Sequence, residues 1–200
     1  MIDTLVHVIL VLALPPLLPG VIARTKAAFA GRNGPPLLQG YYDLARLLRK
    51  GSVLPAGSGW VFLAGPVAGV AAPLFVSLLL PFGSHSAPVA FAGDMILFAY
   101  LFALGRFFTA AAALDTGSAF EGMGAAREVA FSCLAEPALF FGFVALARIS
   151  GSLSLSTMLG TGPGWVTAGA PLVLVAASWA VVLLAENCRI PFDDPNTHLK

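Results

Sequence analysis

Long apolar stretches alternate with shorter polar connectors along the chain. Five stretches approach or exceed the length of about 20 predominantly apolar residues that a membrane-spanning helix needs. They cover residues 4–23, 60–81, 94–114, 127–149 and 166–185. The first stretch contains Pro15, Pro16 and Pro19, and each proline removes a backbone donor, so a kinked or shortened helix is expected there. The pattern predicts an all-α, polytopic integral membrane protein in which residues 1–200 form a single transmembrane domain.

The connector at residues 24–59 carries a different pattern. From Leu37 onward, apolar residues recur at helical spacing on one face and polar residues on the other, just after Pro35 and Pro36, which suit a helix start. The apolar face comprises Leu37, Leu38, Tyr41, Leu44, Ala45 and Leu48, and the polar face comprises Gln39, Asp43, Arg46 and Lys50. Such a helix is expected to lie in the membrane interface. It would either bind anionic lipid as a topology signal or dock a peripheral partner.

Composition strengthens the prediction of a membrane protein. Hydrophobic residues make up 58% of the chain and charged residues 10%, whereas soluble domains contain about 45–50% apolar residues. The mean hydropathy is +0.88. With only two Cys, the chain cannot supply the four thiolates of an iron–sulfur cluster. Any redox metal is therefore expected in another chain, and neither nucleotide chemistry, hydrolysis nor nucleic-acid binding is expected here.

Basic residues favour every second connector. The first connector contains Arg24, Lys26, Arg32, Arg46, Arg49 and Lys50, and the next, at residues 82–93, contains none. The positive-inside rule assigns base-rich connectors to the cytoplasm. It therefore predicts cytoplasmic loops at residues 24–59, 115–126 and 186–200. The N-terminus would lie outside and residue 200 inside, in the inner (plasma) membrane.

Charged residues inside the predicted spans are candidates for chemistry, because each costs about 2.5–3.5 kcal/mol at the centre of a bilayer. Arg106 lies near the middle of the third span, and Glu128 and Glu136 lie on one face of the fourth. With Asp115 and Glu186 at span ends, these carboxylates predict a proton path from the cytoplasmic side. Two alternatives remain open. Arg106 pairs with one carboxylate and only holds helices together, or the charges form a transporter substrate site.

Three motifs occur in order in or beside the connectors predicted to be cytoplasmic. GRNGPPLLQGYYDLARLLRK fills residues 31–50, GMGAAREVAFSCLAEP holds Arg127 and Glu136, and AENCRIPFDDP begins with the residue before Glu186. Together they resemble the membrane subunit known as subunit 1 of respiratory NADH:quinone oxidoreductase, or complex I. LDTGSAF and FDDPNTHL are more similar to the homologous subunit of formate hydrogenlyase, in the hydrogenase-4 branch of membrane-bound NiFe hydrogenases.

The resemblance implies a subunit without a catalytic metal in an oxidoreductase complex. It would anchor the peripheral hydrogenase module through that module's iron–sulfur small subunit and large subunit. Beside antiporter-like membrane subunits in the lipid bilayer, it would help couple the redox reaction to proton or sodium translocation. The iron–sulfur clusters and NiFe centre would belong to partner subunits. The resemblance is also compatible with a bound quinone. The alternatives are the quinone-site subunit of a complex-I-like enzyme and a passive membrane anchor.

The predicted site residues fall into two sets. The proton path is expected to use Asp115, Glu128, Glu136 and Glu186, with Arg106, Arg127 and Arg189 as charge partners. The docking or quinone loop is expected to use Arg32, Gln39, Tyr41, Tyr42, Asp43, Arg46, Asp193 and Asp194. Gly40 stands where the family often has Pro, which predicts a more flexible start of the interfacial helix. The family continues well beyond this length, so the resemblance implies a chain truncated at its C-terminus.

Overall fold

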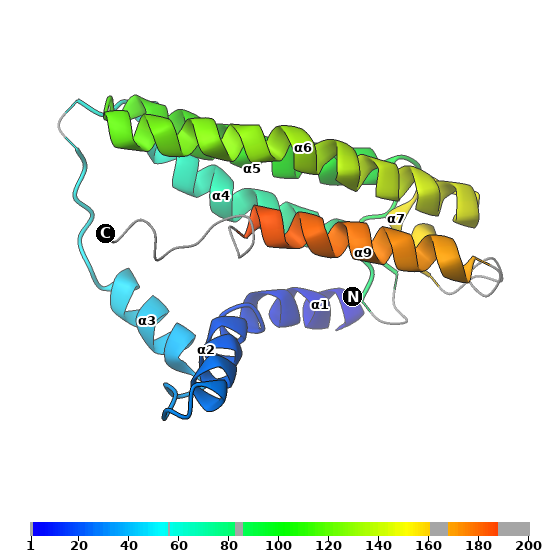
Figure 1. The fold of residues 1–200 in the computed structure, drawn as a ribbon, viewed down its shortest axis with the longest axis horizontal. Coiled ribbons are helices and arrows are strands. Elements are labelled where there is room, and N and C mark those ends of the chain that lie inside the picture. The colour runs from blue at the N-terminus through cyan, green and yellow to red at the C-terminus, as the bar shows by residue number, and fades with distance from the viewer. Residues whose placement is uncertain (1, 56, 83–85, 161–167, 188–200) are drawn as a thin grey trace. The chain divides into compact units, whose positions relative to one another are not determined.

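The computed structural model describes residues 2–55, 57–82, 86–160 and 168–187, and its regular elements there are α-helices (Figure 1). They are α1 (Ile2–Ala13), α2 (Leu17–Phe29), α3 (Gln39–Leu48), α4 (Trp60–Leu79), α5 (Asp94–Asp115), α6 (Ala119–Ser150), α7 (Leu155–Met158) and α9 (Gly169–Glu186). Four of them, α4, α5, α6 and α9, are long and apolar enough to cross a membrane. A fifth span results if α1 and α2 count as one bent helix. The predicted all-α, polytopic class is confirmed.

The chain divides into two units, and the N-terminal unit comprises Met1–Pro55 with α1, α2 and α3. Between α1 and α2 the axis bends by 42°. The bend falls at Pro15 and Pro16, as expected from their missing backbone donors. The backbone N–H of Leu17 donates to Leu14 O at 3.0 Å and closes the turn.

The start of α3 packs closely against the bend between α1 and α2. A Cβ atom placed on Gly40 would lie 2.2 Å from the backbone oxygen of Pro16, and the Tyr41 hydroxyl donates to Ala13 O. Gly40 therefore allows two backbones to approach each other, which a residue with a Cβ atom would prevent. Gly40 thus permits close packing, whereas the sequence predicted that Gly40 would make the start of the helix more flexible.

Replacing Gly40 with Ala is expected to push α3 away from Pro16. Inserting a methyl group into a closely packed contact typically costs about 1–3 kcal/mol. Amide hydrogen exchange in residues 39–48 should become faster. Gly51→Ala is the matched control, because no atom lies within 4 Å of the added Cβ position. Equal exchange in the two variants would contradict the close contact.

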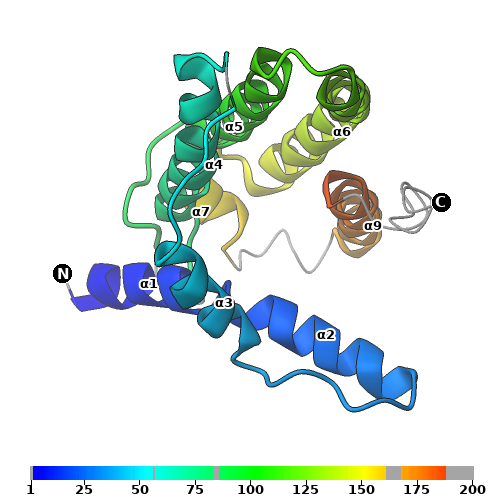
Figure 2. The same ribbon diagram turned by 90° about the vertical axis from the view of Figure 1, so that its left-hand side faces the viewer.

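The C-terminal unit, Ala56–Lys200, is a bundle of the long helices. Helix α5 lies between α4 and α6, and α9 packs against α6 (Figure 2). Helix α6 begins at Ala119, whereas the predicted span began at Arg127, so residues 119–126 are helical. Ser118 occupies the N-cap position, and its hydroxyl bonds the carboxylate of Glu121. Ser-x-x-Glu is a recognised helix-start pattern, and it marks this boundary.

The hydrophobic core lies where α5 begins and α6 ends. It comprises Leu79, Met95, Phe143, Leu146, Leu155 and Met158, of which Leu155 and Met158 are fully buried. Asp94 is also fully buried among them. Its carboxylate accepts hydrogen bonds from Leu155 N at 2.6 Å and from the Ser154 hydroxyl at 3.0 Å. Asp94 thereby caps α7 and joins that short helix to α5.

Contact between α6 and α9 depends on one small and one large residue. A Cβ atom on Gly142 would lie 2.1 Å from Nε1 of Trp179, so the indole occupies the space above the glycine. The rings of Trp179 and Phe143 meet edge to face with centroids 5.1 Å apart. Trp179 of α9 therefore packs directly against Gly142 and Phe143 of α6.

Candidate functional site

Arg106 is the centre of a charged cluster that joins three helices. Its Nη2 donates to Glu136 Oε1 at 2.8 Å, and its Nη1 donates to Glu186 Oε1. The three side chains come from α5, α6 and α9, and we call them the ion triad. The Arg106 side chain is 19% exposed, Glu136 38% and Glu186 27%. One alternative from the sequence was that Arg106 pairs with a single carboxylate. The structure shows ion pairs with two carboxylates.

The ion triad has one cation and two anions, and so carries one net negative charge when both carboxylates are ionised. An arginine side chain does not lose its proton in proteins. Any change of charge in the triad must therefore occur on Glu136 or Glu186. Uptake of one proton by either carboxylate would make the triad neutral.

Two cavities flank the ion triad. The larger has a volume of about 420 Å³ and is lined by Phe98, Phe102, Arg106, Ala135, Glu136, Leu139, Trp179, Val182, Leu183, Glu186 and Asn187. The smaller has a volume of about 140 Å³ and is lined by Ala99, Tyr100, Ala103, Arg106, Glu136, Leu139 and Phe140. Three side chains, Arg106, Glu136 and Leu139, line both. The two cavities therefore adjoin at these three residues.

The other predicted carboxylates lie outside the ion triad. Asp115 accepts hydrogen bonds from the backbone N–H groups of Gly59 at 2.6 Å and Phe62 at 3.2 Å, so it caps the start of α4. Glu128 is half-buried on α6 and forms no ion pair with another described residue. Arg127 lies over the ring of Phe131 at 5.7 Å. Arg189, Asp193 and Asp194 lie outside the described residues.

Replacing Asp115 with Ala is expected to destabilise the start of α4. Loss of a capping side chain typically costs about 1 kcal/mol, because the first N–H groups of the helix lose their acceptor. Thermal unfolding in detergent would measure the change. Asp115→Asn keeps one acceptor oxygen and should lose less. An Ala variant as stable as the wild type would show that the cap contributes nothing.

The predicted docking residues on α3 divide into bonded and outward-facing groups. Gln39 Nε2 donates to both carboxylate oxygens of Asp43 at 3.1 Å, and Arg46 Nη2 lies 3.6 Å from Asp43 Oδ1. This confirms that the three polar residues share one face. Tyr41 is engaged within the N-terminal unit through Ala13. Tyr42, which is 60% exposed, has its side chain turned outward. Arg32, before the helix, is also exposed.

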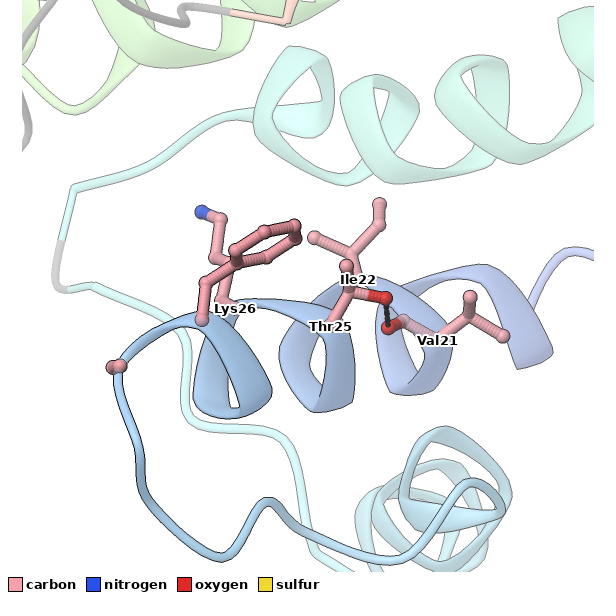
Figure 3. Close-up of a pocket in the computed structure, with 6 residues that line it drawn as sticks. Val21, Ile22, Thr25 and Lys26 are labelled. Atoms are coloured by element: carbon pink, nitrogen blue, oxygen red, sulfur yellow. Dashed lines mark hydrogen bonds between the residues drawn. The ribbon is translucent and has the colours of Figure 1, made fainter.

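A separate hollow lies on α2 (Figure 3). It has a volume of about 520 Å³ and is lined by Val21, Ile22, Thr25, Lys26, Phe29 and Ala30. The Thr25 hydroxyl donates to Val21 O at 2.8 Å, so it is already engaged within the helix. All six residues come from α2 and the residue after it, and this groove does not have the convergent polar groups from different elements that typify a ligand site.

The described residues contain no group of three or more His, Cys, Asp or Glu side chains that could hold a metal ion. The ion triad offers two carboxylates, which can bind a proton, and one guanidinium, which keeps its positive charge. The sequence located Arg106 and both carboxylates. It did not locate Asp94, whose position at a span end resembles that of an ordinary interfacial acid.

Comparison with known proteins provides independent evidence for the family of this chain. A profile of the NADH dehydrogenase family matches residues 2–198. The chain is 37% identical to formate hydrogenlyase subunit 4 of Escherichia coli (strain K12), over 94% of this chain and 62% of that protein. It is 36% identical to hydrogenase-4 component C of the same organism, over 94% of this chain and 60% of that protein. The chain thus spans less than two thirds of the length of these relatives.

Among solved structures, the chain is similar to one from the membrane-bound sulfane sulfur reductase (MBS), described as an archaeal respiratory membrane complex. The similarity has a TM-score of 0.77 and 25% sequence identity, and it covers 92% of this chain and 61% of that chain. The helical arrangement described above is therefore one already observed in a membrane complex.

Proposed function

Since this chain belongs to the NADH dehydrogenase family, we propose that it is the membrane subunit of an energy-converting oxidoreductase complex of the hydrogenase type. It anchors a peripheral NiFe-hydrogenase module and helps couple that module's reaction to proton translocation. The identity to formate hydrogenlyase subunit 4 supports the hydrogenase branch. The observation that carries the coupling role is the ion triad, because charges between membrane-spanning helices are costly and typically functional.

The proton path would run along α6 to the ion triad. Glu128 and Glu136 are eight residues apart, which corresponds to about 12 Å along the helix. Both lie on nearly the same face of α6. Water in the cavities would carry the proton between carboxylates, and Glu136 and Glu186 would bind it in turn. Asp115 would stand at the mouth of the path while it caps α4. Arg127 and Arg189 would balance charge near the entry.

Docking would use the polar face of α3 and the segment after α9. Arg32, Tyr42 and Arg46 are exposed. With Asp193 and Asp194 they would contact the iron–sulfur small subunit and the large subunit on the cytoplasmic side. This arrangement requires the N-terminus outside and residue 200 inside the inner membrane. Antiporter-like membrane subunits would lie beside the helical bundle in the bilayer.

Purification from native membranes tests this proposal directly. A tag on this subunit would be used to isolate the complex in mild detergent, and the eluate would be assayed for nickel and for hydrogen evolution. Near-stoichiometric nickel with hydrogenase activity is the expected result. An untagged strain processed in parallel sets the background. Bound quinone and iron without nickel would assign the chain to the quinone-reducing branch, and isolation without any oxidoreductase subunit would overturn the proposal.

A further inference from the structure

We propose that Arg106 is an electrostatic gate that separates the two cavities at rest and opens when Glu136 takes up a proton. This inference rests on the proposed function, because it assigns a mechanism to the same ion triad. It goes beyond a row of carboxylates, since it names the cation between them as the element that controls passage.

The shared wall between the cavities provides the geometric basis. Leu139 forms the apolar part of this wall, and Arg106 with Glu136 forms the polar part. Glu186 lines only the larger cavity. A proton moving between the two cavities through their common wall therefore meets the Arg106–Glu136 pair first and Glu186 afterwards, or the reverse.

The two bonds of Arg106 explain how the wall can open. With both carboxylates ionised, the guanidinium is held by Glu136 on one side and Glu186 on the other. A proton arriving from the smaller cavity forms an O–H bond on Glu136, which removes the charge that holds Nη2. The guanidinium then moves toward Glu186, the proton passes through water in the opened wall to the larger cavity, and Glu136 regains its charge. The return of Arg106 closes the wall.

The neighbouring groups are consistent with this mechanism. Tyr100 lines the smaller cavity and Asn187 the larger, and both are uncharged. Among the described residues that line either cavity, the charged ones are Arg106, Glu136 and Glu186. The position of the guanidinium is therefore governed by the two carboxylates that bind it. A cation fixed in a narrow passage also repels other cations, as in other membrane proteins that exclude ions by an arginine.

A passive-leak measurement on the intact complex tests the gate. The complex would be reconstituted in vesicles with a trapped pH-sensitive dye, and a pH gradient imposed without redox substrates. Arg106→Gln is expected to dissipate the gradient at least about tenfold faster than wild type, equivalent to a barrier lower by about 1.4 kcal/mol. Arg106→Lys keeps a charge but loses the planar fork that bridges two carboxylates, so its leak should be intermediate, roughly threefold. It serves as the test if the Gln variant fails to assemble.

Two further variants separate a gate from a structural contact. Leu139→Ala removes the apolar part of the wall and leaves the charges intact, so its leak should stay close to that of wild type. The double variant Arg106→Gln, Glu136→Gln should leak less than Arg106→Gln alone, because the proton-carrying carboxylate is gone. A leak in Leu139→Ala as large as in Arg106→Gln would mean that the barrier is steric, and would overturn the proposal.

The outcome also distinguishes this inference from the proposed function. Redox-driven proton uptake would be measured in the same vesicles with Glu136→Gln. If that variant pumps normally, the proposed proton path is wrong. If it stops pumping while both Arg106 variants assemble and hold the gradient as well as wild type, the path stands and only the gate is overturned.

Discussion

Replacing Glu136 with Gln is expected to abolish redox-driven proton translocation while redox turnover stays measurable. The Gln side chain has nearly the same size and shape, so it replaces the carboxylate that accepts from Arg106 Nη2 at 2.8 Å without leaving a cavity. It cannot bind and release a proton at neutral pH. Loss of a positioned proton-transferring group typically lowers the rate by roughly two orders of magnitude or more. Proton uptake by vesicles containing the complex during hydrogen evolution would measure the effect.

Glu121→Gln is the matched control for this experiment. Glu121 lies on the same helix, but it is exposed and bonds Ser118 at the helix start. It lines neither cavity beside the ion triad. The control should pump like the wild type. Normal pumping by Glu136→Gln would instead support the passive-anchor alternative, in which Arg106 and its carboxylates only hold helices together.

Replacing Asp94 with Ala is expected to produce the largest loss of stability, about 3 kcal/mol. The carboxylate is fully buried and accepts hydrogen bonds from Leu155 N, the Ser154 hydroxyl and Phe91 N. A hydrogen bond typically contributes about 0.5–1.5 kcal/mol, and a buried donor left without an acceptor adds a further cost. Helix α7 would lose its cap, and the core residues Leu155 and Met158 would lose their support. Thermal unfolding in detergent would record a lower Tm.

Two variants show whether the loss comes from the buried hydrogen bonds. Asp94→Asn keeps the volume and one acceptor oxygen, so it should recover part of the stability. Asp43→Ala makes the same substitution on the half-exposed face of α3, where the ion pair with Arg46 is screened by water. Surface ion pairs contribute about 0–1 kcal/mol. An Asp94→Ala variant no less stable than Asp43→Ala would refute the assigned role.

Hydropathy located the helices well where apolar residues were uninterrupted. The stretches predicted at residues 60–81 and 94–114 correspond to α4 (Trp60–Leu79) and α5 (Asp94–Asp115). It was less informative at the start of α6, where Glu121 and two glycines dilute the apolar signal. The Ser118–Glu121 pair marks the helix start there, although residues 119–126 are mostly exposed.

The candidate site was only partly predictable for a different reason. The high cost of charge in a membrane singled out Arg106 and Glu136 from the sequence. It could not indicate that one guanidinium bonds carboxylates on both α6 and α9, because pairing depends on how the helices rotate against each other. The partners of Asp115 are backbone N–H groups, which every residue except proline has and which therefore leave no sequence signal.

The contact between Gly142 and Trp179 has an evolutionary consequence. Because the indole fills the space beside Gly142, neither position is free to change alone. A larger residue at 142 becomes acceptable only after 179 has become smaller, and that first step would loosen the helix that carries Glu186. In descendants of this chain the two positions should therefore change together or not at all, and lineages that replace both should also show altered partners for Arg106.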